Sequence, residues 1–130
     1  MFDNVNSTLE QGNIGLGDAI SYFTRNKMAV SIPLNDTQKY DLVVDMNGEL
    51  KRVQVKTTIQ KTKYKIPVVS LRTNGGNMSG RGKYYFLDKS KTDYVYILSD
   101  DNGRWLIPIE MVENMRSLNL GKKYDSYKCR

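Results

Sequence analysis

The sequence predicts a single α+β domain, α/β-like in its element order, with a central mixed β-sheet flanked by helices. Three observations predict this class: an amphipathic helix early in the chain, two hairpins with apolar strands, and a second helical segment near the C-terminus. At 130 residues the chain can bury one core but is too short for two domains. We therefore expect residues 1–130 to form one unit, with flexible ends at 1–12 and 121–130.

The first expected element is an amphipathic helix over residues 14–26. The apolar residues Leu16, Ala19 and Phe23 recur there at helical spacing, so one face of the helix should pack on the sheet. A short strand is expected next, at Ala29–Pro33.

A hairpin centred on Asn47-Gly48 follows. Asn-Gly between two apolar runs favours a two-residue turn, because both residues tolerate positive φ. Such a turn places Asp41 opposite Gln54, with Lys56 as the diagonal neighbour on the same face. The residues that alternate with them are leucine and valines, which suit a buried sheet face.

The second half of the chain is expected to complete the sheet. The elements are a strand at 65–72, a glycine-rich loop at 73–83, a hairpin of strands 93–98 and 104–109, and a helix at 110–117 with Met111 and Met115 on its core face. Residues 83–90 are the candidate for a second core helix. The loop is no Walker phosphate-binding loop, because Lys83 is followed by Tyr84.

The composition excludes several hydrolytic chemistries. The chain has no histidine, which removes Ser-His-Asp and Cys-His catalysis and histidine-containing zinc sites. Its one cysteine, Cys129, excludes an intramolecular disulfide. The chain has no apolar run of membrane-spanning length and no signal-peptide start, so we expect no membrane association and a cytoplasmic location. Magnesium-and-carboxylate chemistry is among the few hydrolytic routes left.

The predicted cluster of Asp41, Gln54 and Lys56 fits such chemistry. A carboxylate and an amide oxygen are hard ligands suited to Mg²⁺, and a nearby ammonium can orient an attacking water or balance phosphate charge. The same spacing also fits a cross-strand Asp–Lys pair beside a hydrogen-bonding glutamine, with no catalytic role.

The residues of this hairpin resemble the PD-(D/E)XK nuclease superfamily. They are similar to its branch of small phage, bacterial and group I intron-encoded (homing) endonucleases, in which glutamine replaces the second acid. The matching segments are Tyr40–Val44, Arg52–Thr58, Gly12–Gly15 at the first helix, Val30–Asp36 before the motif, and Trp105–Ile109 late in the chain.

The resemblance implies a restriction-endonuclease-like core and an enzyme that hydrolyses DNA phosphodiesters with Mg²⁺, or with Mn²⁺ as a substitute. Asp41 would be a metal ligand, Gln54 the amide that replaces the usual acid, and Lys56 the catalytic lysine. Homing, junction resolution and phage recombination or repair remain alternative roles. Cutting both strands of a duplex needs two active sites, which favours a homodimer or homotetramer.

The first helix departs from the family pattern. Many members carry a glutamate at the position matched by Leu16, so we expect Asp18 or Glu10 to supply a replacement metal ligand. The alternative is a catalytically weak or inactive DNA-binding or accessory protein that retains the nuclease fold.

The charge balance favours a polyanionic partner. Twenty basic residues exceed fourteen acidic ones, giving a net charge of +6. We expect DNA contacts from Lys51, Arg52, Lys61, Lys63, Lys65, Arg72, Arg81 and Lys83. The lysines between 61 and 65 equally fit an edge strand protected against aggregation. An RNA- or single-strand-binding β-domain is a third reading, supported only by charge and tyrosines.

Overall fold

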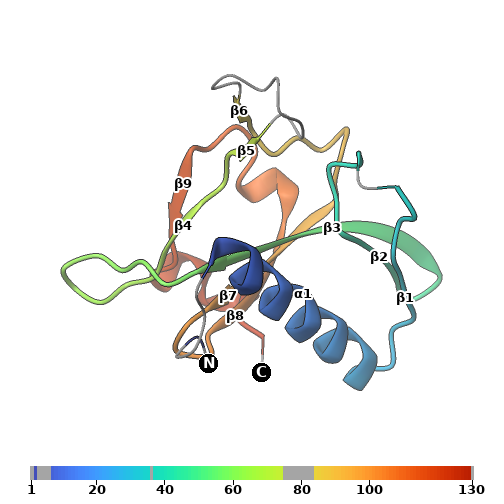
Figure 1. Cartoon of the computed structure of the whole chain (residues 1–130), viewed down its shortest axis with the longest axis horizontal. Coiled ribbons are helices and arrows are strands. Elements are labelled where there is room, and N and C mark those ends of the chain that lie inside the picture. Colours follow the sequence, from blue (N-terminus) through green and yellow to red (C-terminus); the bar gives the residue numbers. More distant parts are fainter. Residues whose placement is uncertain (1, 3–6, 36, 75–83, 130) are drawn as a thin grey trace.

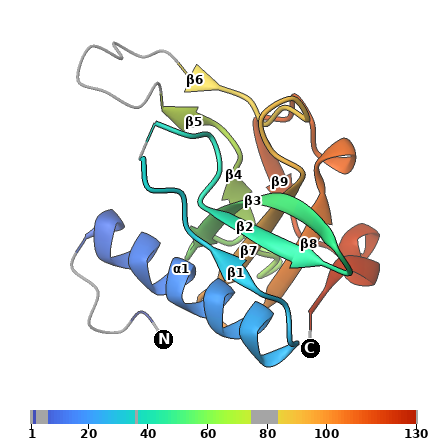
Figure 2. The same ribbon diagram turned by 90° about the vertical axis from the view of Figure 1, so that its right-hand side faces the viewer.

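The fold is described from a computed structural model, which covers residue 2 and residues 7–35, 37–74 and 84–129. A five-stranded sheet lies between one long helix and a second layer of short elements (Figures 1 and 2). The elements are α1 (Thr8–Arg25), β1 (Val30–Ser31), β2 (Leu42–Met46), β3 (Glu49–Thr58), β4 (Val68–Ser70), β5 (Thr73–Asn74), β6 (Tyr84–Tyr85), β7 (Tyr94–Ser99), β8 (Arg104–Pro108), β9 (Ser117–Asn119), and the 3-10 helices η1 (Ile109–Met111) and η2 (Lys122–Tyr127).

The central sheet has the strand order β1-β2-β3-β7-β8. Strands β3 and β7 run parallel, whereas the other neighbouring pairs are antiparallel. Two separate antiparallel pairs, β4–β9 and β5–β6, complete the described strands. The predicted α+β class with a central mixed sheet is confirmed.

The β2–β3 hairpin has the predicted register. Asn47 and Gly48 both adopt positive φ, 58° and 89°, as a tight two-residue turn requires. Leu42 pairs with Val53 and Met46 with Glu49 along the two strands. The apolar face of the hairpin is buried under α1 (Figure 2), against a core that includes Ala19 and Phe23.

Helix α1 begins six residues before the predicted start. The Oγ of Ser7 accepts a hydrogen bond from the backbone N–H of Glu10 at 3.1 Å, which caps the helix. Thr8–Gly12, which belong to the segment 1–12 expected to be flexible, lie in this helix. Ser7 and Glu10 have the spacing of a capping box, a signal that the apolar periodicity alone did not use.

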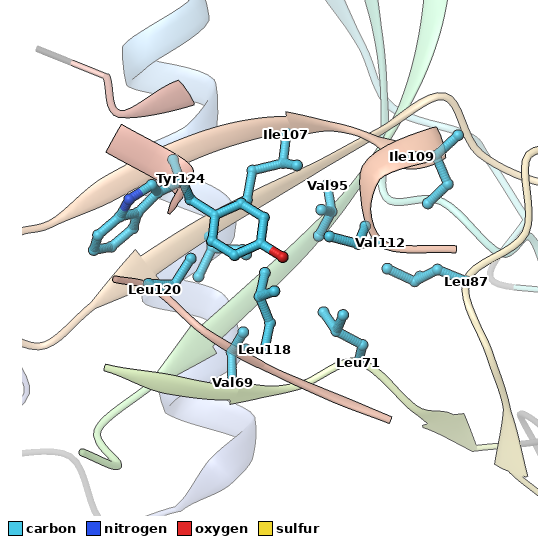
Figure 3. Packing of buried hydrophobic residues seen from close by; sticks show 12 residues of the cluster. Val69, Leu71, Leu87, Val95, Ile107, Ile109, Val112, Leu118, Leu120 and Tyr124 are labelled. Carbon is cyan, nitrogen blue, oxygen red and sulfur yellow. The ribbon is translucent and has the colours of Figure 1, made fainter. Parts of the chain in front are cut away.

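The second layer covers the other face of the sheet. Side chains from β4, β7, β8, β9 and the loops around them point toward one another in a buried cluster (Figure 3). Tyr124 of η2 belongs to this cluster, and the backbone N–H of Cys129 donates to the carbonyl of Arg104 at 2.7 Å. Part of the segment 121–130, which was expected to be flexible, therefore packs on the core through Tyr124.

Two predicted helices are absent. Residues 84–92 contain β6 and a turn in which Thr92 N–H donates to the Asp88 carbonyl, and no second core helix forms there. Residues 110–117 contain only the end of η1 and the start of β9. Asn114 adopts a φ of 64°, which interrupts a helix, and Met111 is 40% exposed while Val112 is buried instead. Among the described residues, no helix is long and apolar enough for a membrane span.

The contact between α1 and β3 depends on a glycine. A Cβ built on Gly15 would lie 2.1 Å from Thr57 Cγ2, whereas one on Gly17 would meet nothing within 4 Å. We expect Gly15→Ala to lower the free energy of unfolding by about 1–3 kcal/mol, because the helix would be pushed from the strand. Gly17→Ala, in the same helix, should raise it by up to about 1 kcal/mol.

Urea denaturation of the two variants measures both effects. Adding Thr57→Ala to the Gly15→Ala variant removes the clashing methyl group and should recover part of the loss. A Gly15→Ala protein as stable as the Gly17→Ala protein would contradict this close approach.

Candidate active site

The start of the β2–β3 hairpin brings Asp41 and Gln54 together. Asp41 directly precedes β2, and its backbone N–H donates to the carbonyl of Val53 at 2.9 Å, so strand pairing continues past the end of β2. The Nε2 of Gln54 donates to Asp41 Oδ2 at 3.0 Å. The predicted pairing of these two side chains is therefore present.

The carboxylate of Asp41 is held by hydrogen bonds to one of its two oxygens, Oδ2. Its Oδ2 also accepts the backbone N–H of Val55 at 2.8 Å, and no hydrogen bond in the described part of the chain engages Oδ1. Because an ionised carboxylate only accepts hydrogen bonds, the NH₂ of Gln54 must face it. The carbonyl oxygen of Gln54 consequently points away from Oδ2, which leaves one oxygen on each residue for a further partner.

Lys56 lies two residues beyond Gln54 on β3 and therefore on the same side of the strand. Its Nζ donates to the backbone carbonyl of Arg72 at 3.3 Å, just before β5. Burial lowers the pKa of Lys56, and the charge of Asp41 only partly offsets this. Burial likewise raises the pKa of Asp41, against the opposing effects of the Val55 N–H and the Lys56 charge. Both charged forms would thus gain from a further ionic partner.

A pocket of about 260 Å³ lies between Asp41 and Gln54 on one side and the N-terminal half of α1 on the other. The helix contributes Thr8, Leu9, Gly12, Asn13 and Leu16, and the hairpin contributes Asp41, Gln54 and Val55. The position of Leu16 therefore does face the site, as the family pattern implies. Thr8 and Asn13 bring polar groups that the sequence analysis missed, because it started the helix at residue 14.

The predicted metal role of Asp18 does not fit its surroundings. Its Oδ2 accepts the hydroxyl of Tyr96 at 2.6 Å and the Nε of Arg104 at 2.7 Å, and its Oδ1 accepts Nη2 of Arg104 at 2.6 Å. Burial would raise the pKa of Asp18, but these hydrogen bonds and the Arg104 charge outweigh it and lower the pKa. Asp18 is therefore a structural partner of β7 and β8.

Glu10 lies in the first turn of α1 and is not one of the residues that line the pocket. Its role as a metal ligand stays a prediction. In the described part of the chain, no group of three or more acidic or cysteine side chains is arranged to hold a metal ion. Any metal at this site would need amide oxygens or substrate oxygens in addition to Asp41.

Three of the predicted DNA-binding residues are engaged in ion pairs. The guanidinium of Arg52 donates to Asp93 at 3.0 and 3.2 Å and to two carbonyls of the 89–90 turn. The Nζ of Lys51 lies 2.9 Å from Glu49 Oε2, and the Nζ of Lys61 lies 3.1 Å from Asp100 Oδ1 and 3.9 Å from Asp101 Oδ2. Arg52 is consequently assigned a structural role, in which it joins β3 to the residue that directly precedes β7.

The other predicted contacts differ in position. Lys63 and Lys65 are exposed in the connection between β3 and β4. Arg72 is also exposed, and its backbone carbonyl accepts the hydrogen bond from Lys56. Arg81 and Lys83 lie outside the described residues, as does most of the glycine-rich loop.

Comparison with known proteins identifies the family of this chain and a solved structure of similar fold. Residues 6–123 match the family model described as PD-(D/E)XK endonuclease, and the chain belongs to that family. The solved structure of a bacterial homing endonuclease, I-Ssp6803I, is similar to this chain with a TM-score of 0.80 and 22% identity over 95% of this chain and 89% of that one. The expected restriction-endonuclease-like fold is thereby confirmed. No curated protein sequence matches the chain.

Proposed function

We propose that this chain is a metal-dependent endodeoxyribonuclease that hydrolyses DNA phosphodiester bonds at the Asp41–Gln54–Lys56 cluster. The observation that carries the proposal is the relative orientation of the Asp41 and Gln54 side chains. The shared hydrogen bond fixes Asp41 and Gln54 so that one oxygen of each is left over, with a lysine ammonium on the same side of β3.

The donor set fits a hard divalent ion. One carboxylate oxygen and one amide oxygen resemble the few protein ligands that Mg²⁺ takes when it keeps several waters, and Mn²⁺ accepts the same donors. When bound, such an ion supplies Lewis-acid stabilisation of the phosphate charge and activates the attacking water. Val55 N–H and Gln54 Nε2 hold the Asp41 carboxylate in one orientation for this task.

Lys56 is proposed to stabilise the negative charge that develops on the phosphate. Its ammonium is held by the Arg72 carbonyl, which orients it without neutralising its charge. Because burial disfavours the charged lysine, an incoming phosphate would be a favourable partner. Arg72, whose carbonyl accepts the hydrogen bond from Lys56, is proposed to bind the DNA backbone beside the site.

A nuclease-like DNA-binding protein without cleavage activity is the second candidate. Leu16 faces the pocket where family members place an acid, and Asp18 is committed to Arg104. This reading predicts DNA affinity without a metal-dependent product.

Asn13 is a polar α1 residue that lines the pocket together with Asp41 and Gln54, and its amide could compensate for the missing acid. We expect Asn13→Asp to tighten Mn²⁺ binding, because it adds a charged oxygen ligand, and Asn13→Ala to weaken it, each by about 10-fold or more. Calorimetric titration of the DNA-free protein measures this. Thr24→Asp adds the same charge at the exposed far end of α1 and should leave the affinity unchanged. Equal effects of Asn13→Asp and Thr24→Asp would contradict a local role for residue 13.

Cleavage assays distinguish the two candidate functions. Supercoiled, linear and branched DNA are incubated with the protein in Mg²⁺, Mn²⁺ or EDTA. Products in either metal and none in EDTA support the enzyme, and the preferred DNA form narrows the role among homing, resolution and repair. Intact DNA in both metals, together with salt-dependent binding, supports the binding protein. Sedimentation in the same buffers tests the proposed dimer or tetramer.

A further inference from the structure

The connection between β3 and β4 forms an arm that projects from the body of the fold (Figure 1, green-yellow loop at the left). We call residues 60–67 the β3–β4 arm. Lys61 and Pro67 form an antiparallel bridge, and the N–H of Val68 donates to the Gln60 carbonyl at 3.0 Å. The arm is thus a hairpin-like extension and not an irregular loop.

Thr62 organises the tip of the arm. Its backbone N–H donates to the Ile66 carbonyl at 2.8 Å, and its carbonyl accepts the N–H of Lys65 at 2.9 Å. Its Oγ1 accepts the N–H groups of Tyr64 and Ile66 at 3.1 and 3.3 Å. These four bonds hold the tip residues 63–65 in a defined turn.

The base of the arm is fixed to the turn between β7 and β8. Lys61 Nζ lies 3.1 Å from Asp100 Oδ1 and 3.9 Å from Asp101 Oδ2, and Asp100 N–H donates to the Thr58 carbonyl at 3.1 Å. The charge of Lys61 is therefore balanced within the protein, and its role is to position the arm.

The tip has a different character. Tyr64 is 74% exposed, and the Nζ of Lys63 lies 5.1 Å from the centre of its ring. Within the described residues, neither Lys63 nor Lys65 forms an ion pair. Two lysines without an ion pair, which flank an exposed tyrosine at the tip of a hydrogen-bonded arm, suit a polyanion that offers both phosphates and apolar sugar edges.

We propose that the β3–β4 arm contacts duplex DNA away from the cleaved phosphate, with Lys63 and Lys65 on backbone phosphates and Tyr64 packed against the sugars. This inference rests on the proposed function. Tyr64 lies eight positions beyond Lys56, which at a strand rise of roughly 3.3 Å gives a reach of at most about 26 Å. At 3.4 Å per base pair, the arm would lie within about eight base pairs of the cut.

DNA binding measured against salt concentration tests the arm directly, in Ca²⁺ or EDTA so that no cleavage occurs. The double variant Lys63→Ala with Lys65→Ala should reduce the slope of log affinity against log salt by about 1.8, the value for two phosphate contacts. Tyr64→Ala should lower the affinity and leave the slope unchanged, because the ring carries no charge.

The matched control is Lys89→Ala with Lys91→Ala. This pair removes the same charge from the exposed turn whose carbonyls bind Arg52, near the other end of β3. Its slope should stay near that of the wild type. Duplexes with shortened flanks add a length test: the wild type should lose affinity at a flank length of about eight base pairs or fewer, and the Lys63/Lys65 variant should show no such loss.

The outcomes separate this inference from the proposed function. If the wild type cleaves DNA but the Lys63/Lys65 variant keeps the wild-type slope, the arm proposal is overturned and the nuclease stands. A loss of slope equal to that of the Lys89/Lys91 control also overturns it, since the effect would then be one of net charge. If the wild type binds no DNA under any condition, both proposals fail.

Discussion

Asp41→Asn is expected to abolish metal-dependent DNA cleavage and to leave DNA affinity similar or slightly tighter. Among the described residues that line the pocket, the substitution removes the one carboxylate, and with it a negative charge near the bound phosphate. Loss of Lewis-acid stabilisation worth several kcal/mol corresponds to a rate reduction of about 10²–10⁴-fold. Nicking of supercoiled plasmid in Mg²⁺ gives the rate, and fluorescence anisotropy in Ca²⁺ gives the affinity.

Asp45→Asn is the matched control for this variant. Asp45 lies on the same hairpin, but its Oδ1 accepts the N–H of Gly48 at 2.8 Å in the turn, at the opposite end of β2 from Asp41. Its substitution should leave the cleavage rate within a few-fold of the wild type. Equal losses in the two variants would show a general effect on the hairpin and would remove Asp41 from its proposed role.

Asp18→Ala is expected to have the largest effect on stability. The ion pair between Asp18 and Arg104 is mostly buried, with the two side chains 11% and 23% exposed. Removing the carboxylate leaves the guanidinium of Arg104 and the hydroxyl of Tyr96 without their shared acceptor. We expect a loss of about 3 kcal/mol in the free energy of unfolding, measured by urea denaturation. Asp125→Ala, at an exposed position of η2, should change it by less than about 0.5 kcal/mol.

The same pair gives a pH dependence of defined sign. The pKa of Asp18 is lower in the folded protein than its ordinary value of about 3.9. Its ionised form therefore contributes fully to stability above about pH 4 and loses this contribution as the pH falls through the folded pKa. The stability difference between the wild type and Asp18→Asn should be constant from pH 5 to 8 and shrink below pH 4. A difference that persists at low pH would contradict an electrostatic origin.

The Asp18→Asn variant also tests whether Asp18 has only a structural role or is a metal ligand as well. Below its melting temperature, folded Asp18→Asn should bind Mn²⁺ as the wild type does, because Asp18 is paired with Arg104 and does not line the pocket. Weakened metal binding in the folded variant would restore the role first predicted for this residue.

The local chemistry of one turn made much of the site predictable. Asn47-Gly48 determined the register of the hairpin, and the register alone placed Asp41 beside Gln54. Such a prediction succeeds because a two-residue turn permits few backbone conformations. The helix start was missed for the opposite reason: glycines and polar residues before Ile14 hide the apolar periodicity, although Ser7 and Glu10 signalled the cap.

Long-range contacts could not be predicted from local patterns. Asp18 and Arg104 are 86 positions apart, and the parallel pairing of β3 with β7 joins segments separated by some forty residues. Asp18 was predicted to be a metal ligand because it lies near the expected position on α1, and only the structure shows that Arg104 of β8 is its partner. The C-terminal segment likewise appeared polar and free, whereas Tyr124 completes the second core.

The position of Mn²⁺, determined by anomalous X-ray diffraction from crystals of the protein with a non-cleavable DNA analogue, tests the proposed active site most directly. The expected result is an anomalous peak about 2.0–2.2 Å from Asp41 Oδ1 and the carbonyl oxygen of Gln54, with Lys56 on the phosphate side. Mn²⁺ bound by other residues, or Gln54 turned so that its NH₂ faces the ion, would contradict the assignment of Asp41, Gln54 and Lys56 as the metal-dependent cleavage site.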